Sequence, residues 1–281
     1  MTGIADESSP SIASQIENHH ALGWTDIELR NVDGQNVCEM PNEKFEKVYA
    51  VISEANFSVV SFDSAIANWA RPITTDFQRD VGDLRRSIPR MRRLHSKYIR
   101  IMSYPNDGFT EKEWRDETFR RIRELTRIAE GEGVVLLLEN CDGYASASPE
   151  RLSWLFSTLD SPALKIVFDS GNPVSHGADE KKTMEFFEAA LPWIAHFHIK
   201  DCALISGKVE HTYPGEGASG VGNHIRILLK RGYEGLFSIE PHMAIQVHLG
   251  GKPAPGVDQK GIYLKYGEKA WNLVLAALLA L

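Results

Sequence analysis

Four metal-competent side chains stand at the ends of four successive apolar runs in the second half of the sequence. They are Glu139, Asp169, His198 and Glu240. Neighbours in this set are separated by 30, 29 and 42 residues, close to one strand plus one helix each time. Three carboxylates and one imidazole suit a hard or borderline divalent cation, and their negative charge requires a cation nearby. The sequence therefore predicts one divalent ion per chain, with Mn²⁺ as the first choice and Mg²⁺, Co²⁺ or Zn²⁺ as alternatives.

The elements that would bring these side chains together are the strands of a parallel barrel. Short apolar or β-branched runs alternate eight times with amphipathic stretches of helix length. The predicted strands are residues 3–5, 25–29, 57–62, 98–102, 134–138, 165–168, 194–199 and 236–239. We expect one α/β domain over residues 1–281, a (β/α)₈ TIM barrel, with a doubly wound open sheet as the alternative. In such a barrel the C-terminal strand ends converge, so the four side chains should meet at one point.

Two further predictions concern the segments between strands. Thr110 and Glu113 have the spacing of a capping box, which predicts a helix over residues 110–131. Residues 201–222 are predicted to form a long polar loop. This loop contains a G-x-G-x-x-G match at residues 215–220, but no apolar strand precedes it. We therefore interpret it as a loop over the active site and not as a dinucleotide-binding turn.

Composition and charge argue against several classes of protein. The 281 residues carry a net charge of −7, which is unlike a protein that coats nucleic acid. The three cysteines form no C-x-x-C pair, as expected for a reducing compartment. Residues 1–10 lack the apolar core of a signal peptide, and the longest apolar run, residues 273–281, is too short to cross a bilayer. We expect a cytoplasmic protein without a nucleic-acid or membrane partner.

Four motifs around the candidate ligands resemble those of a known family. In this chain they read Glu139-Asn140, Asp169-Ser-Gly-Asn172, His198-Ile-Lys200-Asp201 and Ile239-Glu240. They are similar to the E-N, D-x-G-N, H-x-K-D and (I/V)-E signatures of the sugar phosphate isomerase/epimerase family, within the xylose isomerase-like TIM barrels. The resemblance implies that the four ligands bind one divalent metal and that Glu139 and Glu240 are the catalytic acid/base pair.

The same resemblance marks two departures from relatives within that group. Ketose 3-epimerases carry His three residues after the metal-binding Asp, where this chain has Asn172. Apurinic endonucleases need additional His ligands, and the third and fourth predicted strands end without His. The resemblance therefore favours a carbohydrate substrate over DNA.

Four further side chains are candidates for substrate contacts. They are Asn172, Lys200, Glu216 and His242. Lys200 would share the strand face of His198, with a salt bridge to a neighbouring carboxylate as the alternative. His242 stands in the same relation to Glu240 and could donate a proton. Glu216 lies in the Gly-rich loop.

Three other polar positions lie on the predicted strands. Glu28 and Arg30 alternate at the end of the second predicted strand, so both face the cavity or pair with each other at the barrel mouth. His196 is interpreted as an inner-barrel histidine whose hydrogen bonds are satisfied within the protein.

Three hypotheses about function follow. The first is a metal-dependent isomerase or epimerase acting on a keto-sugar or polyol-derived ketone through an enediolate. The second is a metal-dependent lyase or dehydratase that eliminates from a 3-keto-glycoside or inosose. The third is a non-catalytic sugar-binding barrel or a subunit of a larger assembly. We expect an unphosphorylated substrate, because no phosphate loop is recognisable, and we expect that a homo-oligomer can form.

Overall fold

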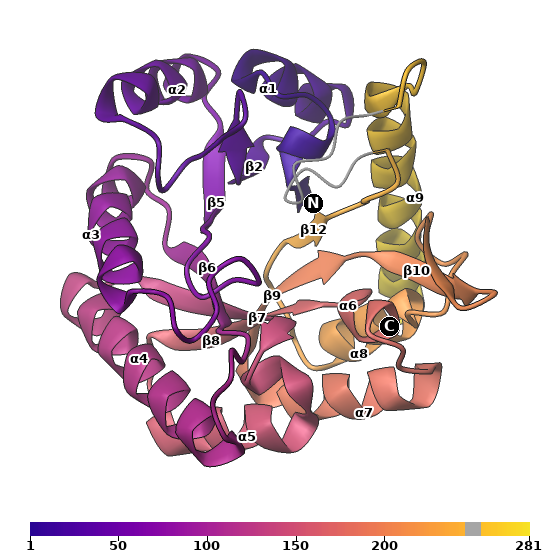
Figure 1. Cartoon of the computed structure of the whole chain (residues 1–281). Helices are drawn as coiled ribbons and strands as arrows, with labels where there is room; N and C mark the ends of the chain where they lie inside the picture. The colour runs from indigo at the N-terminus through magenta and orange to yellow at the C-terminus, as the bar shows by residue number, and fades with distance from the viewer. Residues whose placement is uncertain (245–253) are drawn as a thin grey trace.

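Eight parallel strands form the barrel of this chain. The computed structural model describes residues 1–244 and 254–281. Its main sheet has the order β1-β12-β9-β8-β7-β6-β5-β2, and a parallel bridge between Ile4 and Glu28 joins the two outermost strands. The helices surround these strands, and the N-terminus lies beside β12 (Figure 1). The predicted (β/α)₈ barrel is confirmed.

The elements follow the predicted alternation, with ends that shift by a few residues. The barrel strands are β1 (Thr2–Gly3), β2 (Asp26–Leu29), β5 (Ser58–Asp63), β6 (Tyr98–Ser103), β7 (Val135–Gly143), β8 (Leu164–Asp169), β9 (Ile194–Ile199) and β12 (Phe237–Ile239). The α-helices are α1 (Ile12–Ala21), α2 (Asn42–Glu54), α3 (Phe77–Arg93), α4 (Glu111–Glu132), α5 (Pro149–Leu159), α6 (Asn172–Ser175), α7 (Glu180–Ala190), α8 (Val221–Lys230) and α9 (Gln259–Leu279). Short 3₁₀ helices are η1 (Ala5–Glu7), η2 (Ala145–Ala147) and η3 (Leu191–Trp193).

Helix α4 shows how local sequence sets an element's ends. The Thr110 hydroxyl accepts a hydrogen bond from the backbone N–H of Glu113, whose carboxylate accepts one from the Thr110 N–H. This is the predicted capping box, and it satisfies two N-terminal backbone donors. The helix ends at Gly133, whose φ of 71° is left-handed and suits glycine.

The strand period carries polar side chains to the rim of the barrel. Alternate residues of a strand face the same side, so Val135, Leu137 and Glu139 share one face of β7. Val135 and Leu137 pack with Val167 of β8 in a small apolar cluster, separate from the larger core. Asp169 follows Val167 on the same face of β8. Apolar side chains therefore fill the interior of the barrel between β7 and β8, and acidic side chains follow at the C-terminal ends of these strands.

Two antiparallel hairpins lie outside the barrel ladder. One pairs β3 (Asn31–Val32) with β4 (Gln35–Asn36), and the other pairs β10 (Asp201–Ile205) with β11 (Lys208–Thr212). Both turn through two residues with positive φ, Asp33-Gly34 and Ser206-Gly207, as in type I′ turns. The prediction of a loop over residues 201–222 is therefore wrong for residues 201–212, which form the second hairpin.

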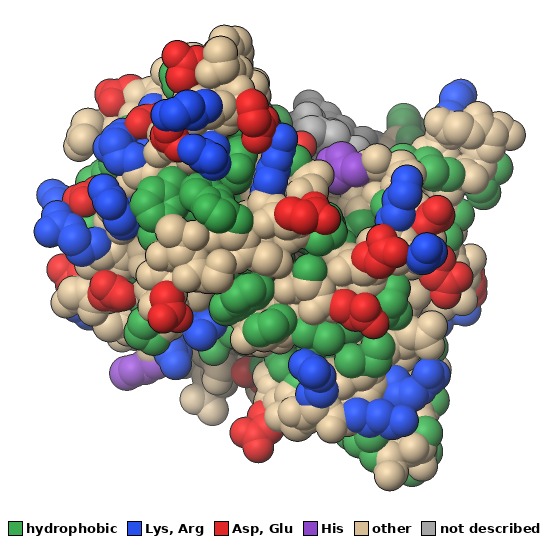
Figure 2. Space-filling view, turned by 90° about the horizontal axis from the view of Figure 1, so that it is seen from below, with side chains coloured by type: hydrophobic (Ala, Val, Ile, Leu, Met, Phe, Trp, Pro, Cys, Tyr) green, Lys and Arg blue, Asp and Glu red, His purple; other side chains and the backbone are tan. Residues whose placement is uncertain are grey.

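The surface carries charges of both signs. Lys and Arg side chains are interspersed with Asp and Glu over the face drawn in Figure 2, with hydrophobic groups between them. This distribution differs from the basic stripe that favours a phosphate backbone. Among helices of the described residues, none combines the length and apolar character needed to cross a membrane.

Candidate metal centre and substrate pocket

The four predicted ligands come together at the C-terminal ends of their strands. Each is at most 2% exposed, and one candidate ligand atom from each lies within 4.8 Å of those from the other three. His198 Nδ1 is 4.0 Å from Asp169 Oδ2 and 3.9 Å from Glu240 Oε2. Two ligands held at about 2.1 Å from one ion can lie up to about 4.2 Å apart, and both His198 distances fall within this span. The group is therefore close to the size of a site for one divalent ion.

Three candidate ligand atoms of this group lack a hydrogen bond of suitable geometry among the described residues. They are Glu139 Oε2, Asp169 Oδ2 and His198 Nδ1. The two carboxylate oxygens have ion-pair partners, Arg100 and Lys200, at 3.2 and 2.8 Å. Buried polar atoms without such bonds are rare and destabilising. A divalent ion bound by Glu139, Asp169, His198 and Glu240 would coordinate all three atoms at once, so the donor set fits a metal.

The surrounding network holds more carboxylates than cations. In the described part of the chain, its buried carboxylates are Asp6, Glu7, Glu28, Asp63, Glu139, Asp169 and Glu240. Its buried permanent cations are Arg30, Arg100 and Lys200. Burial raises the pKa of Asp169 to about 7, although Lys200 opposes the shift. Burial, reinforced by the charge of Glu28, also raises the pKa of Asp63 to about 7. A dication would offset the excess negative charge that these shifts reflect.

Lys200 reaches the centre of the ligand group. Its Nζ lies 2.8 Å from Asp169 Oδ2 and 2.9 Å from Glu240 Oε2, while its side chain lines the pocket. Both interpretations of Lys200 thus describe the same geometry, because it faces the site and forms salt bridges there. Gly171 makes room for it: a Cβ at Gly171 would lie 2.6 Å from Lys200 Cγ. The glycine of the D-S-G-N segment is therefore required by close approach.

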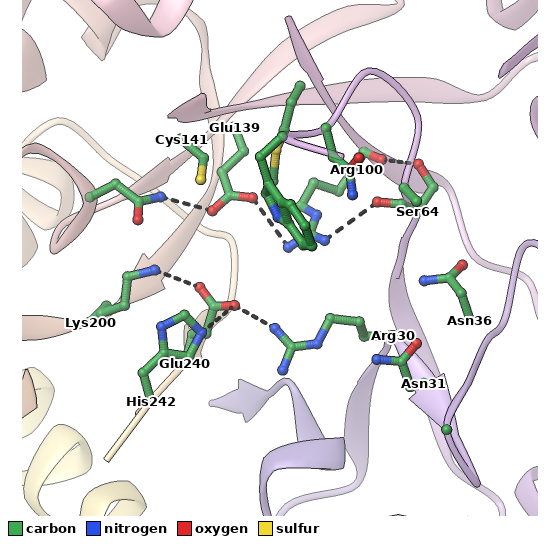
Figure 3. Close-up of a pocket in the computed structure, with 16 residues that line it drawn as sticks. Arg30, Asn31, Asn36, Ser64, Arg100, Glu139, Cys141, Lys200, Glu240 and His242 are labelled. Atoms are coloured by element: carbon green, nitrogen blue, oxygen red, sulfur yellow. Dashed lines mark hydrogen bonds and ion pairs between the residues drawn. The ribbon is translucent and has the colours of Figure 1, made fainter. Parts of the chain in front are cut away.

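Glu240 is held on both carboxylate oxygens. Arg30 Nη1 donates to Glu240 Oε1 at 2.6 Å, and His242 Nε2 lies 3.3 Å from the same oxygen. Figure 3 shows Arg30, Lys200 and His242 directed at this carboxylate. Burial would raise the pKa of Glu240, but Lys200, His242 and Arg30 together hold it well below its usual value. Glu240 is therefore an ionised carboxylate.

The carboxylate of Glu139 has fewer charged neighbours than that of Glu240. Its Oε1 accepts a hydrogen bond of 3.0 Å from Asn172 Nδ2, and its Oε2 lies 3.2 Å from Arg100 Nη1. Asn172 thus lines the pocket as predicted for a substrate contact and also holds a candidate catalytic carboxylate. Arg100 is 6% exposed, and its Nε has no hydrogen-bond partner among the described residues. Arg100 therefore lines the pocket with its guanidinium paired to Glu139.

A pocket of about 340 Å³ opens above the ligands. Its wall includes the β3–β4 hairpin, which contributes Asn31 and Asn36, and the segment after β5, which contributes Asn68 and Trp69. Amide groups can donate to and accept from hydroxyl groups, and an indole offers a flat apolar face. Figure 3 places Asn31 and Asn36 across the pocket from Lys200 and Cys141. These groups suit a small polyhydroxylated molecule.

Glu28 and Arg30 face the barrel interior but do not pair with each other. Arg30 forms a bidentate contact with Asp6 and also contacts Glu7 and Glu240. Glu28 instead lies against His196 and His198. The acidic partners of Arg30 on η1 were missed in the sequence, because they meet it only where the barrel closes.

Comparison with known proteins identifies the family. The profile described as xylose isomerase-like TIM barrel matches residues 16–261. The chain belongs to this family. A curated relative, inosose dehydratase of Serratia proteamaculans, is 26% identical over 152 residues, which are 47% of this chain and 51% of the relative. The chain thus matches about half the length of this relative.

Solved structures agree on the fold of this xylose isomerase-like barrel. A family protein from Mycobacterium smegmatis, in complex with magnesium, superposes with a TM-score of 0.71 at 19% identity, covering 95% of this chain and 89% of that one. D-psicose 3-epimerase with D-tagatose from Clostridium cellulolyticum H10 has a TM-score of 0.71 at 15% identity and covers 99% of both chains. The named enzymes among these relatives include an epimerase and a dehydratase.

The Gly-rich segment of this family member has a structural role. Asp201 Oδ2 accepts backbone N–H groups of Gly215 and Gly217, and Oδ1 accepts those of Cys202 and Ser219. A Cβ at Gly217 would lie 2.3 Å from Asp201 Oδ1. The segment is thus a nest of backbone donors around the chain's own carboxylate.

This nest turns one predicted substrate contact away from the pocket. Glu216 is exposed and pairs with Lys269 of α9 at 2.6 Å. It does not belong to the pocket lining, whereas Lys200, Asn172 and His242 do. The loop conformation imposed by Asp201 was not apparent in the sequence.

Proposed function

We propose that this chain is a divalent-metal-dependent isomerase or epimerase acting on a keto-sugar or a polyol-derived ketone. The observation that carries the proposal is the convergence of Glu139, Asp169, His198 and Glu240 beneath a polar pocket. A bound divalent ion would supply Lewis-acid stabilisation of the enediolate oxygen. Mn²⁺ remains our first choice, with Mg²⁺, Co²⁺ and Zn²⁺ as alternatives.

The residues around the ligands suggest distinct roles for the two catalytic glutamates. Glu139 contacts one cation, Arg100 at 3.2 Å, whereas Glu240 contacts both Arg30 and Lys200. The less strongly ion-paired Glu139 is the better placed base to remove the proton next to the carbonyl. Glu240 lies on the other side of the ligand group and contacts the Lys200 ammonium at 2.9 Å. Glu240, or Lys200 beside it, would return a proton to the opposite face.

The charges support an uncharged substrate. Arg30 and Lys200 each contact at least two buried carboxylates, so their positive charge is already compensated. The pocket wall adds four asparagines, namely Asn31, Asn36, Asn68 and Asn172. We therefore propose an unphosphorylated substrate that is recognised through hydroxyl groups.

A lyase is the second candidate, and Lys200 is the observation that favours it. An ammonium group at the metal-ligand carboxylates could protonate a departing hydroxyl after the same proton abstraction by Glu139. The similarity to an inosose dehydratase points in the same direction. Elimination would give an enone, whereas epimerisation would retain every oxygen.

The deciding experiment uses the purified chain with Mn²⁺ and a panel of keto-sugars and inososes in D₂O. Deuterium uptake at carbon with a new stereoisomer, followed by NMR, supports the isomerase or epimerase. A new ultraviolet enone absorbance supports the lyase. Sugar binding that chelation leaves unchanged, with neither exchange nor elimination, supports the non-catalytic barrel and contradicts both enzymes. Phosphorylated analogues that outperform the neutral compounds would contradict the uncharged substrate.

Several broader expectations remain proposals. We propose one domain for residues 1–281, since the barrel strands run from Thr2 to Ile239 and α9 packs its tyrosines into the core. A cytoplasmic location, a carbohydrate as partner in place of nucleic acid, and a homo-oligomer remain predictions.

A further inference from the structure

A carboxylate on the far side of the barrel supports one metal-ligand histidine. Glu28 of β2 points across the interior to β9, where its Oε1 lies 3.2 Å from His198 Nε2 and 2.8 Å from His196 Nε2. Ser238 of β12 donates its hydroxyl to the other oxygen, Glu28 Oε2. All four residues are at most 1% exposed. Glu28 therefore receives donors from two other strands.

The two nitrogens of His198 have different surroundings. Nε2 faces Glu28, whereas Nδ1 faces Asp169 and Glu240 and has no hydrogen bond of suitable geometry among the described residues. A neutral imidazole carries one N–H, and a metal binds the nitrogen that lacks it. A carboxylate that accepts the N–H of one nitrogen therefore leaves the other nitrogen available to the metal.

We infer that Glu28 is a positioning residue, which holds the proton of His198 on Nε2 and so presents Nδ1 to the ion. This inference rests on the proposed metal site. His196 stabilises the arrangement, because it approaches the same oxygen and its ring meets that of His198 edge-on, with centroids 5.4 Å apart. Glu28 thereby fixes both the tautomer and the ring plane of the ligand.

Three variants separate this role from simple packing. Glu28→Ala removes the acceptor. Glu28→Gln keeps an acceptor oxygen of the same reach but loses the charge. Ser238→Ala is the matched control, because it removes a donor to Glu28 and leaves both histidines untouched. Thermal unfolding of each variant establishes that it is folded.

The first measurement is the affinity for Mn²⁺, from the electron paramagnetic resonance signal of the free ion. Loss of a carboxylate behind a ligating histidine weakens metal binding by roughly 10–100-fold. We expect a loss of this size for Glu28→Ala, recovery of most of it in Glu28→Gln, and unchanged affinity for Ser238→Ala. An equal loss in Glu28→Ala and Ser238→Ala would overturn the inference, as would a Glu28→Gln protein that binds as weakly as Glu28→Ala.

The second measurement reads the tautomer in the wild-type protein, so it does not depend on a variant that folds. Ring-¹⁵N histidine NMR of the Mg²⁺-loaded protein, with His198→Asn for assignment, should show His198 protonated on Nε2. A proton on Nδ1 would overturn the inference. Failure of the wild type to bind any divalent ion would instead contradict the proposed metal site, whatever Glu28 does.

Discussion

The ammonium of Lys200 bridges Asp169 and Glu240, two carboxylates that also belong to the candidate metal centre, and its Nζ lies 2.9 Å from Glu240 Oε2. One oxygen of each acid is thus shared between a fixed cation of the chain and the ion that we propose. The fixed cation lowers the repulsion between the acids, and it also repels a second positive charge.

Replacement of Lys200 by Met should therefore tighten metal binding. Met keeps much of the volume of the side chain and removes the competing charge. Because the Lys200 ammonium repels the ion, we expect its loss to increase the affinity for Mn²⁺ by roughly tenfold or more. The metal-free variant should unfold at lower temperature, because Asp169 loses its salt bridge. Calorimetric Mn²⁺ titration tests the first point, with the exposed Lys230→Met as control. Weaker Mn²⁺ binding than in the wild type would show that Lys200 organises the ligands.

Glu139→Gln tests the proposed base. Gln can still accept the hydrogen bond from Asn172, so the pocket should keep its shape. It cannot accept a proton, and loss of a general base lowers the rate by roughly 10²–10⁴-fold. Saturating Mn²⁺ should not restore turnover or deuterium exchange. Near wild-type exchange at high Mn²⁺ would move the base to another residue.

Glu240→Gln should instead cause a large loss of stability. Arg30 and Lys200 would both lose a charged partner, and removal of one member of a buried ion pair destabilises a protein by roughly 3–5 kcal/mol. Urea unfolding of the metal-free proteins measures this difference directly. Equal stability of Glu139→Gln and Glu240→Gln would contradict the different surroundings found for the two glutamates.

His198→Ala tests the stoichiometry and the ligand set together. We expect one bound ion per wild-type chain and none in the variant by elemental analysis after dialysis. The barrel should stay folded, since His198 lies at the strand end and not within the apolar layers below. Three zinc ions per wild-type chain would contradict the single-ion site. A fully active variant that retains its metal would show that the site is misplaced.

The stability of the metal-free protein should fall as the pH rises from 6.5 to 8. Among the described residues, the groups that bind a proton more tightly in the folded chain over this range include Glu7 with a pKa of about 8, Asp63 and Asp169 with pKa values of about 7, and His198 with a pKa of about 10. A group with a raised folded pKa contributes stability below its unfolded pKa, and loses it as pH rises through the folded value. Below pH 6.5, buried neutral histidines oppose this trend. They include His19 and His211, whose pKa values burial lowers to about 4.

Thermal unfolding in a chelator at pH 6.5, 7.25 and 8 measures this slope. Saturating Mn²⁺ should reduce this slope, because a bound ion would hold the ligand Asp169 ionised and the ligand His198 neutral in the folded state. Glu7 and Asp63, which are not ligands, would keep their contributions. A metal-free melting temperature that rises over this range would contradict the excess of buried negative charge.

The sequence allows the four ligands to be predicted because each follows an apolar strand in a regular repeat, and the barrel brings strand ends together. It does not reveal that Asp6 and Glu7 meet Arg30, since their contact depends on closure between β1 and β2. The contacts that Glu28 makes across the barrel are likewise set by the width of the barrel and not by sequence spacing. The β10–β11 hairpin had a usable signal in Ser206-Gly207, whereas the outward turn of Glu216 depends on the folded loop around Asp201.

The Asp201 nest holds the loop of residues 213–220 in place beside the β10–β11 hairpin. An acidic side chain of the chain itself, Asp201, accepts the backbone N–H groups of this segment, so the chain supplies its own anion to the loop. The tip of the neighbouring hairpin, Ser206-Gly207, lies outside this anchor. Insertions at the tip would lengthen the hairpin without displacing Lys200, so the hairpin can vary in length while the candidate metal centre keeps its geometry.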